Sequence, residues 1–132
     1  MINFCTYFDK NYLSKFINLK MSLDNFNFDY TFYILCLDDF VSDFFKKNNF
    51  LNIVVITLDE IELEYKELLE AKTNREIIEY YFTLSPFLPR YIFKKKGVNQ
   101  ISYLDMILMK SELDELIDNL YQESIKGFDL PF

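Results

Sequence analysis

The chain of 132 residues contains no histidine. This absence excludes Ser-His and Cys-His nucleophile pairs, histidine general bases and metal sites that use histidine ligands. Any metal ion would therefore have to be held by carboxylates. Carboxylate oxygens suit hard ions such as Mg²⁺ or Mn²⁺.

The sequence also lacks a run of about 18 apolar residues, and no cationic segment followed by an apolar stretch and a cleavage site opens it. These absences predict a cytoplasmic protein with no membrane span. Positive charge is scarce too, because 14 basic residues against 21 acidic ones give a formal net charge of -7. Such a charge repels phosphate backbones, so nucleic acid is not expected as a partner.

Cysteine is rare as well: Cys5 and Cys36 both lie in apolar runs, which predicts small buried side chains rather than a disulfide. Apolar residues, in contrast, are plentiful, at 51% hydrophobic and 19% aromatic. This is enough for a core, and the length is typical of one compact domain. We expect a single domain over residues 1–132, with an irregular tail over 126–132.

Short apolar runs alternate along the chain with segments of helical spacing. Strands are predicted at Ile2–Phe8, Thr31–Leu37, Asn52–Leu58 and Gln100–Asp105. Helices are predicted after Asp9, from Asp38-Asp39 to Lys47, from Ile61 through Leu69, over Arg75–Leu84, from Ser85-Pro86 to Lys96, and from Ser111 through Tyr121. The alternation indicates a three-layer, Rossmann-like α/β domain with a mainly parallel sheet of about four strands.

Several of these elements have features that a structure can test. The continuous β-branched run in Asn52–Leu58 is typical of a buried strand. The segment from Ile61 predicts one amphipathic helix with its acidic face in water, whereas Arg75–Leu84 is apolar nearly all round and predicts a buried helix. Ser85-Pro86 offers an N-cap with proline at the first helical position, and Gly97 is the natural stop of that helix.

An acidic residue follows each predicted strand: Asp9, Asp38, Asp59 and Asp105. Ligands of open parallel sheets bind outside the carboxyl ends of the strands, so these carboxylates could face a ligand. The alternative is that they cap the next helix and favour its positive end. We favour capping for Asp38 and Asp59.

Three stretches carry motifs in a consistent order. Phe4–Leu13 contains a strand followed by a D-x-N-Y turn, Asn74–Pro86 reads N-R-x-x-x-E-Y-x-x-T-x-x-P, and Ile101–Asp105 runs into Y-L-D. Together they resemble the N-terminal, nucleotide-binding half of a GT-A-fold nucleotide-diphosphosugar glycosyltransferase, close to the glycogenin and lipopolysaccharide galactosyltransferase group. The resemblance spans residues 2 to 105.

The resemblance implies a nucleotide-diphosphosugar ligand, with a UDP-sugar expected first, and transfer of the sugar to an acceptor hydroxyl. In the family, Mn²⁺ or Mg²⁺ bridges the diphosphate and an aspartate pair and makes the nucleotide diphosphate a better leaving group. Carried over by position, Thr6 and the turn containing Asp9, Asn11 and Tyr12 would contact the base and ribose, with Tyr12 available for stacking. For Thr6 the alternative is core packing, and for Tyr12 it is surface packing.

Carried over in the same way, Arg75 would face a phosphate or the sugar, where its planar guanidinium can make paired hydrogen bonds. Its alternative is an ordinary pairing with Glu79, four residues on. Glu79 and Thr83 share a helix face with Arg75 and would support it, or would be satisfied polar groups in a buried helix.

The sequence departs from the family after Asp105. The resemblance makes Asp105 a metal ligand, but Ile107 occupies the second carboxylate position and an isoleucine cannot ligate a metal. The acceptor-binding half of such enzymes would begin about where this chain stops. We therefore expect a partial or degenerate glycosyltransferase-like domain, or alternatively a non-catalytic interaction module that forms a homodimer or pairs with a partner chain.

Overall fold

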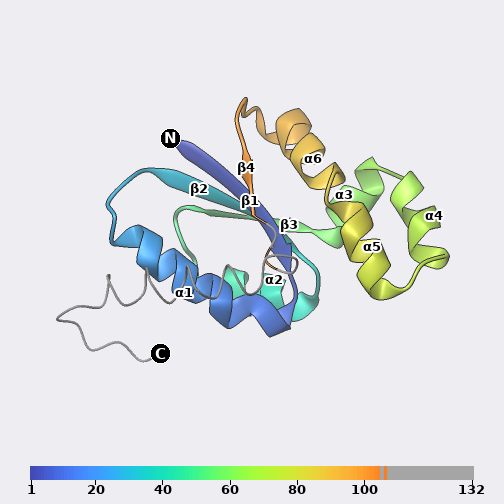
Figure 1. The fold of residues 1–132 in the computed structure, drawn as a ribbon, viewed down its shortest axis with the longest axis horizontal. Coiled ribbons are helices and arrows are strands. Elements are labelled where there is room, and N and C mark those ends of the chain that lie inside the picture. The colour runs from blue at the N-terminus through green and yellow to red at the C-terminus, as the bar shows by residue number, and fades with distance from the viewer. Residues whose placement is uncertain (105, 107–132) are drawn as a thin grey trace.

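The computed structural model describes residues 1–104 and 106, and the strands of this part form one parallel sheet (Figure 1). The strand order is β3-β2-β1-β4, and all three neighbouring pairs are parallel. The bounds are Ile2–Phe8 for β1, Tyr30–Cys36 for β2, Ile53–Thr57 for β3 and Ser102–Tyr103 for β4. The predicted Rossmann-like α/β architecture with a parallel sheet is confirmed.

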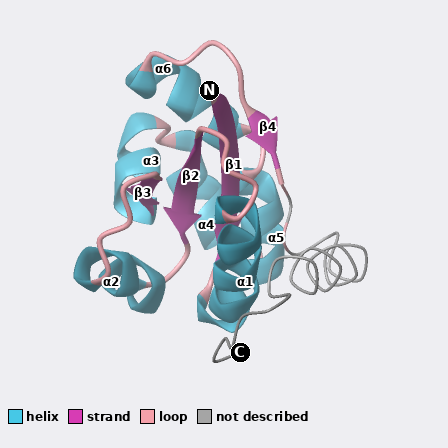
Figure 2. Ribbon diagram, turned by 90° about the vertical axis from the view of Figure 1, so that its left-hand side faces the viewer, coloured by secondary structure: helices cyan, strands magenta, loops and turns pink. Residues whose placement is uncertain are grey.

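Helices cover both faces of this sheet, which gives three layers (Figure 2). One face carries α1 (Leu13–Asp24) and α2 (Asp39–Lys47), and the other carries α3 (Leu58–Glu64), α4 (Glu67–Thr73), α5 (Ile77–Leu84) and α6 (Phe87–Lys96). Because side chains alternate along a strand, β1 contributes to both cores. Its Phe8 packs with the α1 and α2 side, and its Tyr7 packs with the α3 to α6 side.

Both cysteines are buried and free, as predicted. Cys5 belongs to the core beneath α3 to α6, whereas Cys36 belongs to the core beneath α1 and α2. The sheet therefore separates the two thiols. Burial raises the pKa of each thiol from 9.0 to about 12, so both act as small apolar side chains at neutral pH.

The prediction of a buried strand from the β-branched run is wrong for most of β3. β3 lies at one end of the strand order, and Ile53, Val54 and Val55 are only half-buried, while Ile56 is buried. A β-branched run reports that a segment fits a pleated sheet. It does not report whether that strand is central or at the edge.

The single helix predicted from Ile61 is also wrong, because α3 and α4 are separate helices that meet at Tyr65. Tyr65 adopts φ -120° and ψ 87°, which ends α3. Its side chain is buried, and its ring centroid lies 5.2 Å from that of Phe87 in α6. The chain thus leaves the helical conformation at the residue whose ring packs against α6.

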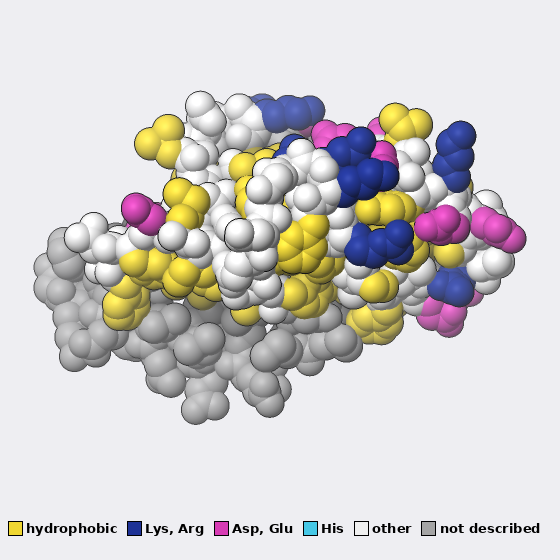
Figure 3. All heavy atoms as spheres, turned by 90° about the horizontal axis from the view of Figure 1, so that it is seen from above, with side chains coloured by type: hydrophobic (Ala, Val, Ile, Leu, Met, Phe, Trp, Pro, Cys, Tyr) yellow, Lys and Arg dark blue, Asp and Glu magenta, His cyan; other side chains and the backbone are white. Residues whose placement is uncertain are grey.

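The prediction that α5 is buried is wrong for most of its length. α5 buries Tyr80 and Leu84, but Ile77 and Ile78 are 64% and 60% exposed. Large hydrophobic side chains reach the surface elsewhere too, as the yellow atoms in Figure 3 show for one side of the molecule. With only two short helices beside it, an apolar helix of eight residues cannot cover all of its own surface.

The start of α6 differs from the prediction, while its end agrees. Ser85 is the C-cap of α5, and its hydroxyl donates to the Tyr7 hydroxyl at 3.2 Å instead of capping α6. Pro86 precedes α6 and makes no side-chain cap. Gly97 ends the helix with φ 68°, a left-handed conformation that glycine adopts without strain.

The fourth predicted strand is shorter than expected. Within Gln100–Asp105 only Ser102 and Tyr103 are in β4, although Leu104 N still donates to Cys5 O at 2.9 Å. Asp105, Ile107, the predicted helix from Ser111 and the tail over 126–132 lie outside the described residues.

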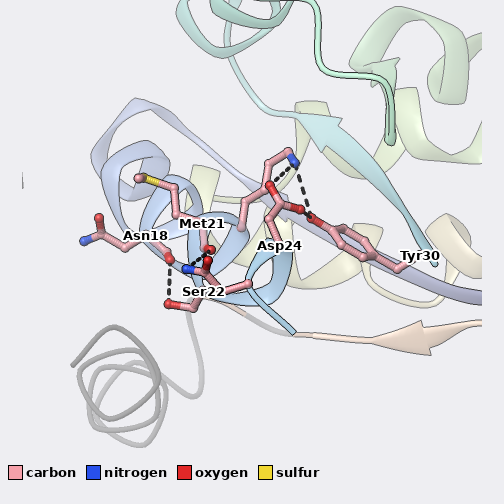
Figure 4. Close-up of polar contacts among 7 residues, drawn as sticks. Asn18, Met21, Ser22, Asp24 and Tyr30 are labelled. Atoms are coloured by element: carbon pink, nitrogen blue, oxygen red, sulfur yellow. Dashed lines mark hydrogen bonds and ion pairs between the residues drawn. The ribbon is translucent and has the colours of Figure 1, made fainter. Parts of the chain in front are cut away.

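A polar cluster ties the end of α1 to the start of β2 (Figure 4). Lys20 Nζ lies 2.9 Å from Asp24 Oδ2, and the Tyr30 hydroxyl donates to the same carboxylate. Within α1, Ser22 Oγ donates to the backbone oxygen of Asn18, one helical turn before it, at 3.0 Å. The contacts of Tyr30 with Lys20 and Asp24 thus link the first residue of β2 to the last turn of α1.

Candidate functional site

The carboxyl ends of β1 and β2 are joined through Asp38. Its Oδ1 accepts a hydrogen bond from Val41 N at 2.9 Å, which caps α2, and its Oδ2 accepts one from Lys10 N at 2.9 Å. Lys10 belongs to the 3₁₀ turn after β1, where Asp9 Oδ1 accepts from Asn11 N at 2.9 Å. The capping role predicted for Asp38 is confirmed, and the same carboxylate holds the turn of the D-x-N-Y motif against the end of β2.

Asp59 does not cap α3. The N-cap is Thr57, whose Oγ1 accepts from Glu60 N at 3.3 Å, so capping by Asp59 was wrongly predicted. Asp59 lies in the first turn of α3, where its charge still favours the positive end of the helix.

Two adjoining hollows lie beyond the ends of β2 and β3, and both are lined by Leu37, Leu58 and Lys72. The first, which we call the acidic hollow, has a volume of about 280 Å³ and is lined in addition by four aspartates: Asp38, Asp39, Asp43 and Asp59. The second, which we call the cationic hollow, has a volume of about 380 Å³ and is lined in addition by Arg75, Ile77, Tyr80 and Tyr81. Together the two hollows form what we call the groove. In it, a cation-rich, partly aromatic hollow lies beside a carboxylate-rich one.

Arg75 lies at the cationic hollow because the segment before α5 brings it there. Its guanidinium donates to Thr83 Oγ1, and that hydroxyl donates in turn to Glu79 O at 2.9 Å. The predicted proximity of Arg75 and Thr83 is confirmed. The alternative pairing of Arg75 with the Glu79 carboxylate is not formed among the described residues; Glu79 contributes through its backbone.

Tyr81 connects the cationic hollow with the turn after β1. Burial raises the pKa of its half-buried phenol, and the negative charges of Asp9 and Asp38 raise it further. Tyr81 therefore lies within electrostatic reach of both carboxylates and remains a neutral hydroxyl at physiological pH.

Two residues predicted to contact the nucleoside, Thr6 and Tyr12, line neither hollow. Thr6 is fully buried in β1, and its Oγ1 has no hydrogen-bond partner among the described residues, which corresponds to the core alternative. Tyr12 is half-buried against the core under α1 and α2, so it does not line either hollow. Asn11 is exposed in the turn and donates from its side chain to Asp9 Oδ2 at 3.4 Å.

The metal site implied by the resemblance finds no support in the part of the chain that the structure describes. No group of three or more Asp, Glu or Cys side chains within residues 1–104 and 106 is placed to hold a metal ion. This holds for the aspartates of the acidic hollow too. Asp105, the ligand expected from the resemblance, lies outside the described residues, as does Ile107.

Sequence reasoning missed Lys72, Tyr80 and Tyr81 as parts of the groove. Lys72 lies just beyond the helix predicted from Ile61 through Leu69, and its partner Glu62 lies ten residues away in a different helix. The break at Tyr65 brings these two residues together, and no regular spacing signals it. The two tyrosines are inside the N-R-x-x-x-E-Y segment, so a close reading of that motif could have included them.

These features define a class: an α/β protein with a parallel sheet and a polar groove outside the carboxyl ends of its strands. The chain is 28% identical over 104 residues to a protein of Bacillus subtilis (strain 168) described as the uncharacterized protein YfnD. The match covers 78% of this chain and 33% of YfnD, so the chain spans about a third of that protein's length. No family model matches the chain, and no solved structure matches it.

None of the helices in the described part of the chain is both long enough and apolar enough to cross a membrane.

Proposed function

We propose that this chain is a nucleotide-diphosphosugar-binding domain of the glycosyltransferase GT-A type, with UDP-sugars as the first ligands to consider. The observation that carries the proposal is the position of Arg75. The motif segment that resembles the family delivers this guanidinium to a hollow outside the carboxyl ends of β2 and β3. In open parallel sheets that is where ligands bind.

The groove supports a division of roles along the ligand. Arg75 would contact the diphosphate, since a guanidinium makes paired, charge-assisted hydrogen bonds to phosphate oxygens. The turn containing Asp9 and Asn11 would face the nucleoside, next to Tyr81. The aspartates of the acidic hollow would accept hydrogen bonds from sugar hydroxyls, because ionised carboxylates are acceptors only. Thr6 is not part of this proposal, since it is buried within the sheet.

The proposal concerns donor binding. Transfer of the sugar would require in addition an acceptor hydroxyl held in line with the anomeric carbon and a group that takes its proton.

The test is a calorimetric titration of the purified chain with UDP, with and without manganese. We expect saturable binding that the Arg75→Ala variant weakens by about tenfold or more, the loss typical of a charge-assisted hydrogen bond. Arg90→Ala is the matched control, because Arg90 lies over the Tyr65 and Phe87 rings and not in the groove. No heat from a folded wild-type chain would refute the proposal.

A second candidate is an interaction module, and the exposed face of α5 favours it. Ile77, Ile78 and Phe82 are 64%, 60% and 39% exposed on one short helix, which suits self-association. We expect sedimentation velocity to show a concentration-dependent dimer that Ile78→Asp abolishes. A monomer at all concentrations would refute this candidate without affecting the first.

A further inference from the structure

Lys72 is held in a defined position at the boundary of the two hollows. Its ammonium lies 3.1 Å from Glu62 Oε2 and 3.4 Å from Glu62 Oε1. The Glu62 side chain is only 6% exposed, whereas that of Lys72 is 48% exposed. The carboxylate therefore anchors the ammonium from below, and an ammonium with three donors has hydrogen-bonding capacity left for a ligand.

Tyr80 completes this arrangement. Its hydroxyl donates to Glu62 Oε2, and its ring lies 5.8 Å from the Lys72 ammonium. Burial raises the pKa of the Tyr80 phenol, and the hydrogen bond to Glu62 raises it further, so the phenol stays protonated and keeps donating. A buried carboxylate and an aromatic ring together restrict where the Lys72 ammonium can lie.

The charged groups that line the cationic hollow are Lys72 and Arg75. Its remaining lining is apolar or phenolic, and Glu62, the carboxylate that pairs with Lys72, is not part of that lining. The volume of about 380 Å³ is within the usual range for small-molecule sites. Two cations in a partly apolar hollow suit an anionic ligand with several charged oxygens, such as a diphosphate.

In a GT-A enzyme a divalent metal would neutralise that diphosphate, but the described carboxylates do not form a site for one, and Ile107 replaces the second aspartate of the motif. We propose that Lys72, positioned by Glu62 and Tyr80, binds the diphosphate together with Arg75 and takes the place of the metal. This inference rests on the proposed function and assigns a metal-independent diphosphate site within it. Lys72 would be a point charge, and Arg75 a planar donor pair, on the same group.

The experiment titrates wild-type protein, Lys72→Met and Lys66→Met with inorganic pyrophosphate and with UDP in the presence of EDTA, then repeats the UDP titration with manganese. Lys66→Met is the matched control, because Lys66 is exposed between α3 and α4 and lines neither hollow. Melting curves check that each variant is folded. In wild-type protein, mass spectrometry also measures whether pyrophosphate protects Lys72 from amine acetylation, which needs no variant.

We expect wild-type and Lys66→Met to bind both ligands in EDTA, Lys72→Met to bind them at least about tenfold more weakly, and pyrophosphate to protect Lys72. UDP binding that requires manganese, or that Lys72→Met leaves unchanged, would overturn this inference and leave the proposed function standing. If pyrophosphate binds in a way that depends on Lys72, and UDP binds no more tightly than pyrophosphate, the anion site is supported and the nucleotide function is refuted. Failure of both ligands to bind, with no protection of Lys72, would overturn both.

Discussion

The Lys20 ammonium lies 2.9 Å from the carboxylate of Asp24, one helical turn further along α1, although the two side chains differ greatly in exposure. The Lys20 side chain is 6% exposed and that of Asp24 is 49% exposed. The ammonium also lies 5.1 Å from the ring of Phe50 and donates to the Tyr30 hydroxyl at 3.3 Å. The charge of the buried Lys20 ammonium is therefore balanced by a carboxylate that is half-exposed to water.

This difference predicts that Asp24→Ala destabilises the fold more than Lys20→Met does. Removing Asp24 leaves the buried ammonium without its counter-charge, at a cost of about 2 kcal/mol, whereas removing Lys20 leaves a carboxylate that water can solvate. We expect Lys20→Met to change the free energy of unfolding by less than about 1 kcal/mol, because methionine keeps the packing. Urea denaturation measures both, and equal losses or the reverse order would contradict the prediction.

Substitution of Gly97 is predicted to be costly through its backbone alone. An added Cβ at Gly97 would meet no atom within 4 Å, but φ is 68°. Gly97→Ala should therefore lower the free energy of unfolding by about 1 kcal/mol, and Gly97→Asn by less, since asparagine tolerates the left-handed region. Thermal melts of the two variants give the comparison. If alanine were as stable as glycine, α6 would have to end differently in solution.

Ser85 is predicted to contribute to stability through two tyrosine hydroxyls. It donates to Tyr7 at 3.2 Å and accepts from Tyr103 at 3.1 Å, which links α5 to β1 and β4. Ser85→Ala should cost about 1 kcal/mol, whereas Ser14→Ala on the exposed side of α1 should cost less than about 0.5 kcal/mol. Chemical denaturation distinguishes the two. Indistinguishable losses would argue that the hydroxyl chain is replaced by water contacts.

The buried cysteines predict a loss of stability in alkaline solution. The pKa of Cys5 and of Cys36 is raised from 9.0 to about 12 in the folded chain, so above pH 9 the unfolded chain releases thiol protons that the folded chain retains. Fewer bound protons in the unfolded state mean that the free energy of unfolding falls with rising pH, by at most about 1.4 kcal/mol per pH unit for each thiol. The buried phenols of Tyr30 and Tyr80, whose pKa values are also raised, act in the same direction.

Denaturation curves between pH 8 and about pH 10.5 measure this fall, and thiolate absorbance in the folded chain provides the control. We expect no thiolate signal from the native protein at about pH 10, where an ordinary cysteine is ionised. A thiolate titration of the native protein with its midpoint near 9 would show that the thiols are accessible to water.

Several elements of the fold could be predicted because their signals are local. β1 over Ile2–Phe8, the cap at Asp38 and the helix stop at Gly97 each follow from a few neighbouring residues, and the structure agrees with all three. The edge position of β3 and the exposure of α5 could not be predicted in that way. Both depend on which other elements lie beside them.

The sequence by itself determined the parallel α/β architecture and the absence of imidazole chemistry, because periodicity and composition are properties of short segments. The tertiary structure decided that Thr6 is in the core, that Tyr65 breaks the helix after β3, and that Glu62 and Tyr80 position Lys72 beside Arg75. The physical reason is that burial and long-range pairing depend on the packing of whole helices against the sheet. That packing brings residues from α3, α4 and α5 to one groove.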